Sequence, residues 1–397
     1  MTRGLELYAS VSRQAASRLV GAGPSGWSGL AGVAAPLRYV EHGDPVVPGP
    51  GWVTVRPRLA GISGSDLALV TGRVSAYLTA MVGLPFVPGQ EVVAEVQESV
   101  TLDDGRVLAA GDRVVVDPAP GSGPGTGDGR VGDGRVGDGR VGDGRAGDGG
   151  WARGVGGGGW SRVMLAHRGQ LCPVPATLPD ARAVLVDPLA AAVHAVDRAR
   201  VGAGQRVLVV GAGAAGLCTV LALRAHTEAG QVAVVAKYPR QAELARRFGA
   251  DVVFDPDGAV AGVRRATHAM RVSPRAGGAF LLGGVDVAFD AAGRASSLST
   301  ALRTTRAGGR VVLSGVPTGR VDLTPLWARG LELVGAARRG AAPSVLARAF
   351  ALAAGAPLDG VVAATYPLTR WREALEHALC AGRLGAVRIA FDPTVAL

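Results

Sequence analysis

A glycine-rich turn is the part of the sequence whose residue types and spacing most clearly predict chemistry. It reads Gly211-Ala212-Gly213-Ala214-Ala215-Gly216, follows the apolar run Arg206–Val210 and opens an apolar helical stretch. In this context the first glycine permits a tight turn, the second lets the backbone approach a pyrophosphate, and the third allows close helix–strand packing. The first N–H groups of the helix, at Ala214 and Ala215, are then available to phosphate oxygens. The pattern predicts a dinucleotide-binding site.

The residues after the next predicted strand indicate which dinucleotide binds. Sites for NAD usually place Asp or Glu about 20 residues beyond the glycine turn, where its carboxylate binds the ribose 2′-hydroxyl. Here that segment reads Val234-Val235-Ala236-Lys237-Tyr238-Pro239-Arg240 and contains no carboxylate. Lys237 and Arg240 would instead pair with a 2′-phosphate, so NADP(H) is favoured over NAD(H). The alternative is that both side chains are solvated surface charges.

Strands alternate with helices around this turn, from Ala181 to about Gly340. GQRVLVVGAGAAGLCTVLALRAH is typical of strand, turn and helix, and QVAVVAKYPRQAELARRFGADVVF of strand, helix and strand. VDVAFDAAG, GRVVLSGVP and LELVGAA are further predicted strands. This alternation predicts an α/β domain with a doubly wound parallel sheet.

Residues 35–120 have a different character, because short Val-rich runs are broken there by Pro and Gly. This pattern predicts a small antiparallel β-barrel. Residues 121–159 follow as low-complexity sequence, in which Gly-Asp-Gly-Arg-Val repeats from Gly127. Such a glycine density cannot bury a core, so we expect a flexible loop, and a repeat expansion without function is the favoured interpretation.

Composition narrows the class of protein further. Hydrophobic residues make up 48% of the 397 residues, which is typical of a globular chain, and no apolar run is long enough to span a membrane. The N-terminus lacks the apolar core of a secretion signal, and three widely spaced cysteines fit a reducing cytoplasm. The net charge of +10 comes from scattered arginines and a single lysine, which argues against nucleic-acid binding.

Five further segments carry a resemblance to a known family. They are Leu59–Leu67 (LAGISGSDL), Pro88–Val92 (PGQEV), Val186–Leu189 (VDPL), Ala307–Gly315 (AGGRVVLSG) and Gly385–Arg388 (GAVR). The first three are similar to the family segments GICGSDL, PGHEV and EPL. Over residues 35–120 and 158–393, the chain resembles the zinc-type alcohol dehydrogenase branch of the medium-chain dehydrogenase/reductase family.

The resemblance implies two domains. A GroES-like β-barrel catalytic domain would comprise residues 1–187 and 339–397, and a Rossmann nucleotide-binding domain residues 188–338. It adds Ser314 and Arg388 to the predicted cofactor-binding residues. It also implies a homodimer or homotetramer paired through the edge of the Rossmann sheet.

The positions that hold catalytic zinc in this family depart from its pattern. Cys, His and a third Cys, Glu or Asp are expected there, and this chain carries Ser63, Gln90 and Asp187. A hydroxyl and a neutral amide are poor zinc ligands, and catalytic sites keep three protein ligands. The structural-zinc lobe, which should hold four cysteines, is replaced by the Gly-Asp-Gly-Arg-Val repeat. We therefore expect no bound metal.

Without zinc, the resemblance implies chemistry that needs no Lewis acid. The favoured hypothesis is an NADPH-dependent reductase of an activated C=C or C=N bond in a small molecule, acting in specialised metabolism. Ser65 aligns with the family's proton-relay hydroxyl, Ser63 and Gln90 would hydrogen-bond the substrate, and Asp187 would orient them or contact a cationic substrate. The family's relay His is replaced by Ala68, so the relay must be shortened or use water.

Alternatives to this hypothesis stay open. Ser65 could simply be a turn residue beside Asp66. The chain could be a zinc-dependent alcohol dehydrogenase with atypical ligands, which tight zinc binding would favour. It could also be a redox-silent member of the family that acts as a cyclase or binding protein, which a lack of turnover with NADPH would favour.

Overall fold

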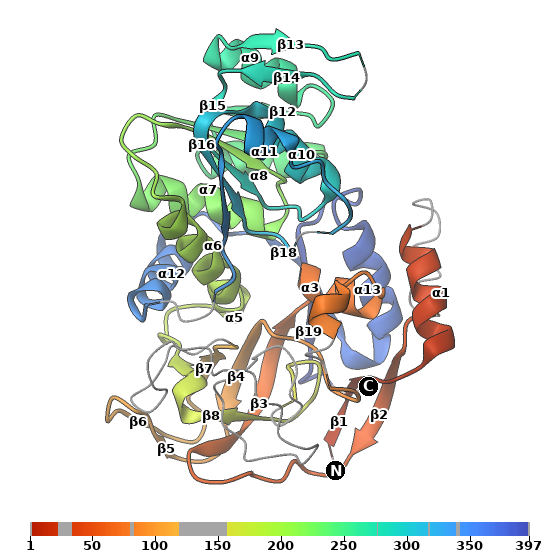
Figure 1. Cartoon of the computed structure of the whole chain (residues 1–397). Helices are drawn as coiled ribbons and strands as arrows, with labels where there is room; N and C mark the ends of the chain where they lie inside the picture. Colours follow the sequence, from red (N-terminus) through yellow and green to blue (C-terminus); the bar gives the residue numbers. More distant parts are fainter. Residues whose placement is uncertain are drawn as a thin grey trace, which may run out of the picture. The chain divides into compact units, whose positions relative to one another are not determined.

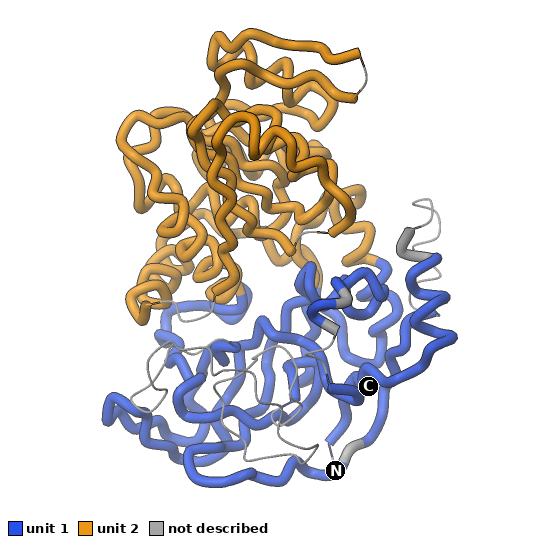
Figure 2. The backbone as a smooth tube through the Cα atoms, in the orientation of Figure 1, with its two compact units in different colours: residues 1–184, 365–376, 390–397 blue, residues 185–364, 377–389 orange. Residues whose placement is uncertain are grey.

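The chain divides into two compact units (Figure 2). The computed structural model describes residues 2–22, 34–79, 83–118, 157–275, 277–316, 318–338 and 342–395. Unit 1 consists of residues 1–184, 365–376 and 390–397, and unit 2 of residues 185–364 and 377–389. The predicted Gly-rich loop 121–159 lies outside the described residues, apart from 157–159.

An antiparallel sheet forms the core of unit 1. Its strands are β3 (Trp52–Gly61), β4 (Val92–Val96), β7 (Arg113–Val116), β8 (Met164–His167), β9 (Leu171–Pro173), β18 (Val362–Pro367) and β19 (Arg388–Asp392). They follow the order β18-β19-β3-β4-β7-β9, and β8 also pairs with β3. Alternate residues such as Val53 and Val55 of β3 and Val92 and Ala94 of β4 enter one apolar core, as the period of a β-strand requires.

The C-terminal strand completes this sheet beside β3. Ala390 and Phe391 of β19 pair antiparallel with Gly61 and Ala60 of β3. The Phe391 ring also meets Trp160 edge to face, with 5.1 Å between the ring centroids. The last strand of the chain is therefore a packed part of unit 1.

The remaining elements of unit 1 are short. They are β1 (Thr2–Leu7), α1 (Val11–Ala22), β2 (Leu37–His42), α3 (Gly64–Val70), α4 (Ala76–Thr79), β5 (Val100–Thr101), β6 (Val107–Leu108), η2 (Arg168–Gln170), α5 (Asp180–Ala183) and η3 (Leu368–Arg370). β1 and β2 form a separate antiparallel pair. This pair and α1 were not predicted from the sequence. Helix α13 (Trp371–Cys380) continues from unit 1 into unit 2.

A parallel sheet of the predicted kind forms the centre of unit 2 (Figure 1). Its strands are β10 (Arg206–Val210), β11 (Gln231–Val235), β12 (Val252–Phe254), β15 (Val285–Asp290), β16 (Thr305–Leu313) and β17 (Glu332–Gly335). The order β12-β11-β10-β15-β16-β17, with each neighbouring pair parallel, is the doubly wound arrangement of dinucleotide-binding sheets.

Unit 2 also contains helices. They are α6 (Val186–Ala199), α7 (Ala214–His226), α8 (Pro239–Arg247), α9 (Ala259–Thr267), α10 (Ala295–Thr304), α11 (Thr324–Ala328) and α12 (Ser344–Gly355). Leu208 and Val210 of β10 share an apolar core with Val263 of α9 and Leu302 of α10. Strands β13 (Met270–Val272) and β14 (Phe280–Leu282) form an antiparallel hairpin outside the parallel sheet. No helix among the described residues is both long and apolar enough to cross a membrane.

The compact units differ in extent from the predicted domains. The first boundary lies at 184/185 instead of 187/188, and residues 342–364 and 377–389 belong to unit 2 instead of the barrel. The physical reason is that α12 packs against α6 and α7 of unit 2. Sequence patterns show where helices begin but not which neighbour buries their apolar side.

Candidate active site

The glycine turn lies between β10 and α7, at the carboxyl end of the parallel sheet. Gly211 has φ +108°, which favours glycine, and it turns the chain sharply at the end of β10. Gly213 is the N-cap of α7, and no side chain caps this helix. The first N–H groups of α7, including those of Ala214 and Ala215, are therefore left for a ligand. A Cβ added at Gly213 would meet only open space, so a pyrophosphate can approach closely there.

Gly216 has the opposite surroundings. A Cβ at this position would overlap the carbonyl oxygen of Gly211, so the first turn of α7 and the end of β10 are in direct backbone contact. One compact turn thus contains all five residues predicted here, which are Gly211, Gly213, Ala214, Ala215 and Gly216. The backbone at Gly213 forms the exposed side of this turn. This arrangement fits a dinucleotide pyrophosphate.

The ends of β15 and β16 pack beside this turn. A Cβ on Gly211 would lie 2.9 Å from that of Ala292, and one on Gly315 would lie 2.5 Å from the Gly293 nitrogen. Asp290 is fully buried, and its Oδ1 accepts hydrogen bonds from the backbone N–H groups of Ala292 (3.2 Å) and Gly293 (3.0 Å). Burial raises the pKa of the Asp290 carboxyl above its ordinary value. This carboxyl therefore fixes the turn that supports Gly211.

Two other predicted cofactor residues belong to unit 2. Ser314 directly follows β16, and its Oγ is buried with no hydrogen-bond partner among the described residues. A ligand or water at this edge would satisfy that hydroxyl. Arg388 begins β19, is 7% exposed, and donates its backbone N–H to Val361 (3.0 Å). The neighbouring strand ends connect Ser314 to the glycine turn, whereas Arg388 lies on β19, a strand of the other large sheet.

Lys237 and Arg240 lie after β11, as the predicted choice of cofactor requires. Lys237 is exposed, with its Nζ 5.5 Å from the centre of the Tyr238 ring. Arg240, in the first turn of α8, binds Glu243 at 2.6 Å. Because a partly exposed ion pair of this kind contributes little free energy, a phosphate could compete for Arg240.

A second group of polar side chains lies in unit 1, where β3 ends and α3 begins. Ser63 is the N-cap of α3, and it forms a reciprocal capping box with Asp66. Ser63 Oγ donates to Asp66 Oδ2 at 2.6 Å and lies 2.7 Å from Ser65 Oγ. Gln90 Nε2 donates to Ser65 Oγ at 3.0 Å. The structure thus brings together Ser63, Ser65 and Gln90, as predicted for a substrate pocket, and adds Asp66.

Comparison with known proteins assigns these two units. The description "Zinc-binding dehydrogenase" matches residues 214–355, and "Alcohol dehydrogenase GroES-like domain" matches residues 49–176. A sorbitol dehydrogenase of Arabidopsis thaliana is 33% identical over 297 residues, which cover 73% of this chain and 74% of that protein. The chain belongs to the medium-chain dehydrogenase/reductase family. It is accordingly an NAD(P)-dependent oxidoreductase of small molecules, with the GroES-like and Rossmann fold class that the sequence predicted.

Two other members of this family extend the comparison. An L-idonate 5-dehydrogenase of Vitis vinifera is 30% identical over 298 residues, which cover 72% of this chain and 73% of the relative. A solved structure of a putative zinc-binding dehydrogenase from Sinorhizobium meliloti 1021, bound to NADP, is 26% identical with a TM-score of 0.67. The alignment covers 90% of this chain and 95% of that one.

The positions where this family holds catalytic zinc do not fit that ion here. Ser63 and Gln90 are engaged in the hydrogen bonds of unit 1 described above. Asp187, in α6 of unit 2, accepts a hydrogen bond from Arg338 at 2.6 Å, and both side chains are largely buried. Zinc in proteins takes thiolate, imidazole or carboxylate ligands. Within the described ranges, no group of three or more His, Cys, Asp or Glu side chains could hold a metal ion.

Asp66 and Arg338 contact predicted site residues, and sequence reasoning missed both. The Ser-x-x-Asp spacing from Ser63 to Asp66 is a local signal for a capping box and could have identified the first. No local signal identifies Arg338, which lies 151 residues from Asp187.

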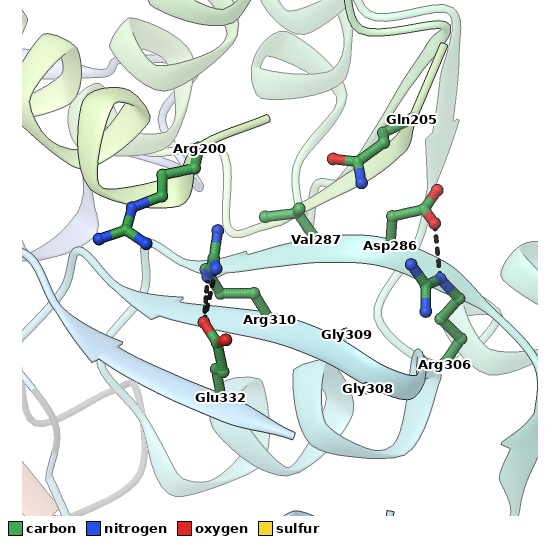
Figure 3. A pocket seen from close by; sticks show the side chains of 9 residues that line it. All are labelled: Arg200, Gln205, Asp286, Val287, Arg306, Gly308, Gly309, Arg310 and Glu332. Carbon is green, nitrogen blue, oxygen red and sulfur yellow. Dashed lines mark hydrogen bonds and ion pairs between the residues drawn. The ribbon is translucent and has the colours of Figure 1, made fainter. Parts of the chain in front are cut away.

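A pocket at the opposite edge of the parallel sheet is not the nucleotide site (Figure 3). It has a volume of about 80 Å³ and is lined by Arg200, Gln205, Asp286, Val287, Arg306, Gly308, Gly309, Arg310 and Glu332. Arg306 binds Asp286 and Arg310 binds Glu332, each at 2.6 Å, so these carboxylates largely neutralise the arginines. Asp286, Val287 and Glu332 lie at the amino ends of β15 and β17, whereas nucleotides bind at the carboxyl ends in such sheets.

Proposed function

We propose that this chain is an NADPH-dependent oxidoreductase that works without zinc and reduces an activated C=C or C=N bond of a small molecule. One observation carries the proposal: each position of the family's zinc site is already engaged within the protein. Ser63 binds Asp66, Gln90 binds Ser65, and Asp187 binds Arg338. Recruiting these groups to a metal would break a hydrogen bond at every position.

The proposed chemistry follows from side chains that do not fit zinc as a Lewis acid. Zinc stabilises the charge that develops on a carbonyl or alkoxide oxygen by several kcal/mol, and a simple ketone loses that help without it. A conjugated C=C bond instead accepts hydride to give an enolate, which hydrogen-bond donors can stabilise. An iminium carries its own positive charge. Bound NADPH supplies the hydride, while Ser65 and Gln90, the partly exposed members of the polar group, would contact the substrate oxygen.

Preference for NADPH rests on the residues after β11. Ala236, Lys237 and Tyr238 provide no carboxylate for a ribose 2′-hydroxyl, and Lys237 is exposed where a 2′-phosphate would need a cation. The Sinorhizobium meliloti neighbour was solved with NADP, which is consistent with this choice.

Binding titrations test the cofactor preference. Replacing Lys237 with Ala should weaken NADPH binding by roughly 10- to 150-fold, the loss of one charged hydrogen bond, and leave NADH binding unchanged. Arg246→Ala is the matched control, because Arg246 is an exposed cation in the last turn of α8, the helix that follows Lys237. An equal loss of NADPH and NADH affinity in Lys237→Ala would contradict the assignment.

The second candidate function is a zinc-dependent alcohol dehydrogenase with atypical ligands. It is favoured by the relatives, which are named as sorbitol and L-idonate dehydrogenases. Elemental analysis after dialysis against a mild chelator separates the two candidates. One retained zinc per chain, together with oxidation of polyols by NADP⁺, would favour the second. Substoichiometric zinc, together with NADPH oxidation by enones or iminium ions, would favour the first.

We further propose a cytoplasmic homodimer or homotetramer. The chain has three cysteines, Cys172, Cys218 and Cys380, which are odd in number and widely spaced in the sequence, as is typical of proteins from a reducing compartment. Size-exclusion chromatography with light scattering would measure the number of subunits.

A further inference from the structure

The β13–β14 hairpin, which precedes β15, carries an apolar face at the surface of unit 2. The two strands pair antiparallel, with Met270 opposite Leu282 and Val272 opposite Phe280. Directly opposite residues, and residues two apart in a strand, point to the same side of a sheet. These four side chains therefore share one side, which we call the hairpin face (Met270, Val272, Phe280 and Leu282). Met270 is 60% and Leu282 47% exposed, so this face is open to solvent.

The other side of the hairpin is buried. Leu281 points away from the hairpin face and is fully buried in the core that also contains Val263 of α9 and Leu302 of α10. One side of the hairpin thus anchors it to unit 2, while Met270 and Leu282 on the other side remain exposed. Adjoining apolar side chains that are exposed in this way, with charged residues around them, are typical of interaction surfaces.

Exposed arginines accompany the hairpin face, and no carboxylate in the same stretch balances them. From residue 258 to residue 284 the sequence contains no Asp or Glu. The exposed arginines of this stretch, which we call the arginine group, are Arg264, Arg265, Arg271 and Arg275. None of the four forms an ion pair within the described part of the chain, whereas Arg240, Arg306 and Arg310 of the same unit each pair with a carboxylate.

The arginine group lies on the hairpin and on the helix packed against it (Figure 1). α9 contacts both β13 and β14, and its last turn contains Arg264 and Arg265. Arg271 lies in β13, and Arg275 lies in the connection to β14. An apolar face and an unbalanced positive charge therefore occur together in one part of unit 2.

This combination distinguishes between the occupants that could cover the face. A second copy of the chain, seated face to face, would bring one arginine group against the other, and like charges repel. A nucleic acid would use the arginines but not the apolar side chains. Insertion into a membrane would bury the tip of the hairpin first, but residues 273–279 are small or polar and include Arg275. An added β-strand is disfavoured because β13 and β14 have only three residues each.

We propose that the hairpin face and the arginine group form a docking surface for an acidic amphipathic helix of another protein. Such a helix presents an apolar stripe between rows of polar residues, so its apolar side chains can cover Met270 and Leu282 while its carboxylates meet the arginines. The complex is expected to be weak and short-lived, because a face of this size is far smaller than a stable interface of about 1,600 Å².

Docking at this surface leaves the nucleotide site open. The hairpin leads through Gly283 and Gly284 into the amino end of β15, whereas the glycine turn lies at the carboxyl end of β10. Because the strands of this sheet are parallel, the two features are at opposite edges of it. A bound helix and a bound dinucleotide should therefore not compete.

Fluorescence anisotropy with a designed peptide tests the docking surface. The probe is a fluorescein-labelled peptide of about 20 residues, long enough to form a helix, with leucine at i, i+3, i+4 and i+7 and glutamate or alanine elsewhere. One control peptide has lysine in place of glutamate, and another has the leucines rearranged so that they form no stripe. We expect the full chain to bind only the first peptide, with an affinity that falls as salt is added. The Kd for NADPH should be the same with and without this peptide.

Serine substitutions measure the apolar contribution. Met270→Ser combined with Leu282→Ser should weaken peptide binding by about 10- to 100-fold. Leu384→Ser is the matched control, because Leu384 is another leucine of unit 2 and is 64% exposed, and it should leave the affinity unchanged. All three side chains are largely exposed, so these variants should keep the wild-type Tm.

Charge reversal measures the contribution of the arginines. Arg264→Glu should weaken peptide binding by about 3- to 10-fold and reduce its dependence on salt. Arg246→Glu is the matched control, because Arg246 is also an exposed arginine in the last turn of a helix of unit 2. It changes the net charge by the same amount, so an equal loss in both variants would show that the peptide responds only to the charge of the whole chain.

Hydrogen–deuterium exchange locates the bound peptide, and it should slow exchange at β13 and β14. The docking surface would be overturned if the wild type showed no saturable binding, bound the three peptides equally, or released the peptide when NADPH was added. Wild-type affinity in the Met270→Ser, Leu282→Ser chain would also overturn it. Tighter binding of phosphatidylglycerol vesicles or of single-stranded DNA, lost with the same substitutions, would assign the surface to a membrane or a nucleic acid instead. A subunit number that falls in the Met270→Ser, Leu282→Ser chain would assign it to a second copy.

Discussion

Two glycines of the nucleotide turn have opposite surroundings, so their alanine variants should separate binding from stability. A Cβ at Gly213 would project into open space at the start of α7, where φ is −74° and alanine is not strained. A Cβ at Gly216 would overlap the carbonyl oxygen of Gly211. We expect Gly213→Ala to lose cofactor affinity with little change in stability, and Gly216→Ala to lose both.

The magnitudes follow from these surroundings. At Gly213, alanine is a poorer N-cap than glycine by about 0.5 kcal/mol, and its methyl group would crowd a bound pyrophosphate. Overpacking of about 1–3 kcal/mol in the complex corresponds to a roughly 5- to 150-fold weaker Kd. At Gly216, the backbone of two elements must separate, at a cost of about 3 kcal/mol. The better helix propensity of alanine offsets about 1 kcal/mol of that, which leaves about 2 kcal/mol of destabilisation.

Calorimetry measures Tm, and titration with NADPH measures Kd, on the same variant proteins. For a unit of this size, about 2 kcal/mol lowers Tm by roughly 4–8 °C, so Gly216→Ala should melt clearly below Gly213→Ala. Wild-type affinity in Gly213→Ala would refute the placement of the pyrophosphate at the start of α7. Wild-type Tm in Gly216→Ala would refute the backbone contact with Gly211.

Two further predictions concern buried carboxyl groups in unit 2. Arg338→Met should lower the free energy of unfolding, measured in urea, by about 3–5 kcal/mol, because it leaves the Asp187 charge buried without its guanidinium. Adding Asp187→Leu in the same chain should restore most of the loss. A loss below about 1 kcal/mol in Arg338→Met would show that the pair is not coupled. Burial raises the pKa of the Asp290 carboxyl, so the native state holds the carboxyl proton more tightly than the unfolded chain does. The free energy of unfolding should therefore fall as pH rises from 3.8 through the folded pKa. Asp290→Asn keeps the acceptor for Ala292 and Gly293, so its Tm should exceed that of the wild type increasingly as pH rises; parallel Tm curves would contradict the prediction.

The parts of the fold that the sequence predicted are those with local causes. The strand Arg206–Val210, the turn from Gly211 and the helix after it form one continuous signal of apolar run, glycine spacing and apolar helix. The β1 strand has no such signal, because its position depends on a distant partner: the Leu5 N–H donates to the Trp160 carbonyl.

The candidate site shows the same division between local and distant causes. The sequence placed Ser63, Ser65 and Gln90 in one site only through a resemblance, since Gln90 is 25 residues from Ser65. The ion pair of Asp187 with Arg338 could not be predicted, because long-range pairing depends on how α6 and the chain after β17 pack. Substitution of the usual ligands was visible in the sequence, but the hydrogen bonds that engage their replacements were not.

The pairing of β19 with β3 has a consequence for synthesis on the ribosome. Gly61 and Ala60 pair with Ala390 and Phe391, which are made much later, whereas β10, β11 and β12 find their partners within a short stretch of chain. Contacts of such long sequence separation form slowly and leave an open strand edge in the meantime. The parallel sheet can therefore assemble on the nascent chain while β3 still exposes the edge that β19 will cover. A chain that lacks β19 would keep that edge exposed and should aggregate more readily.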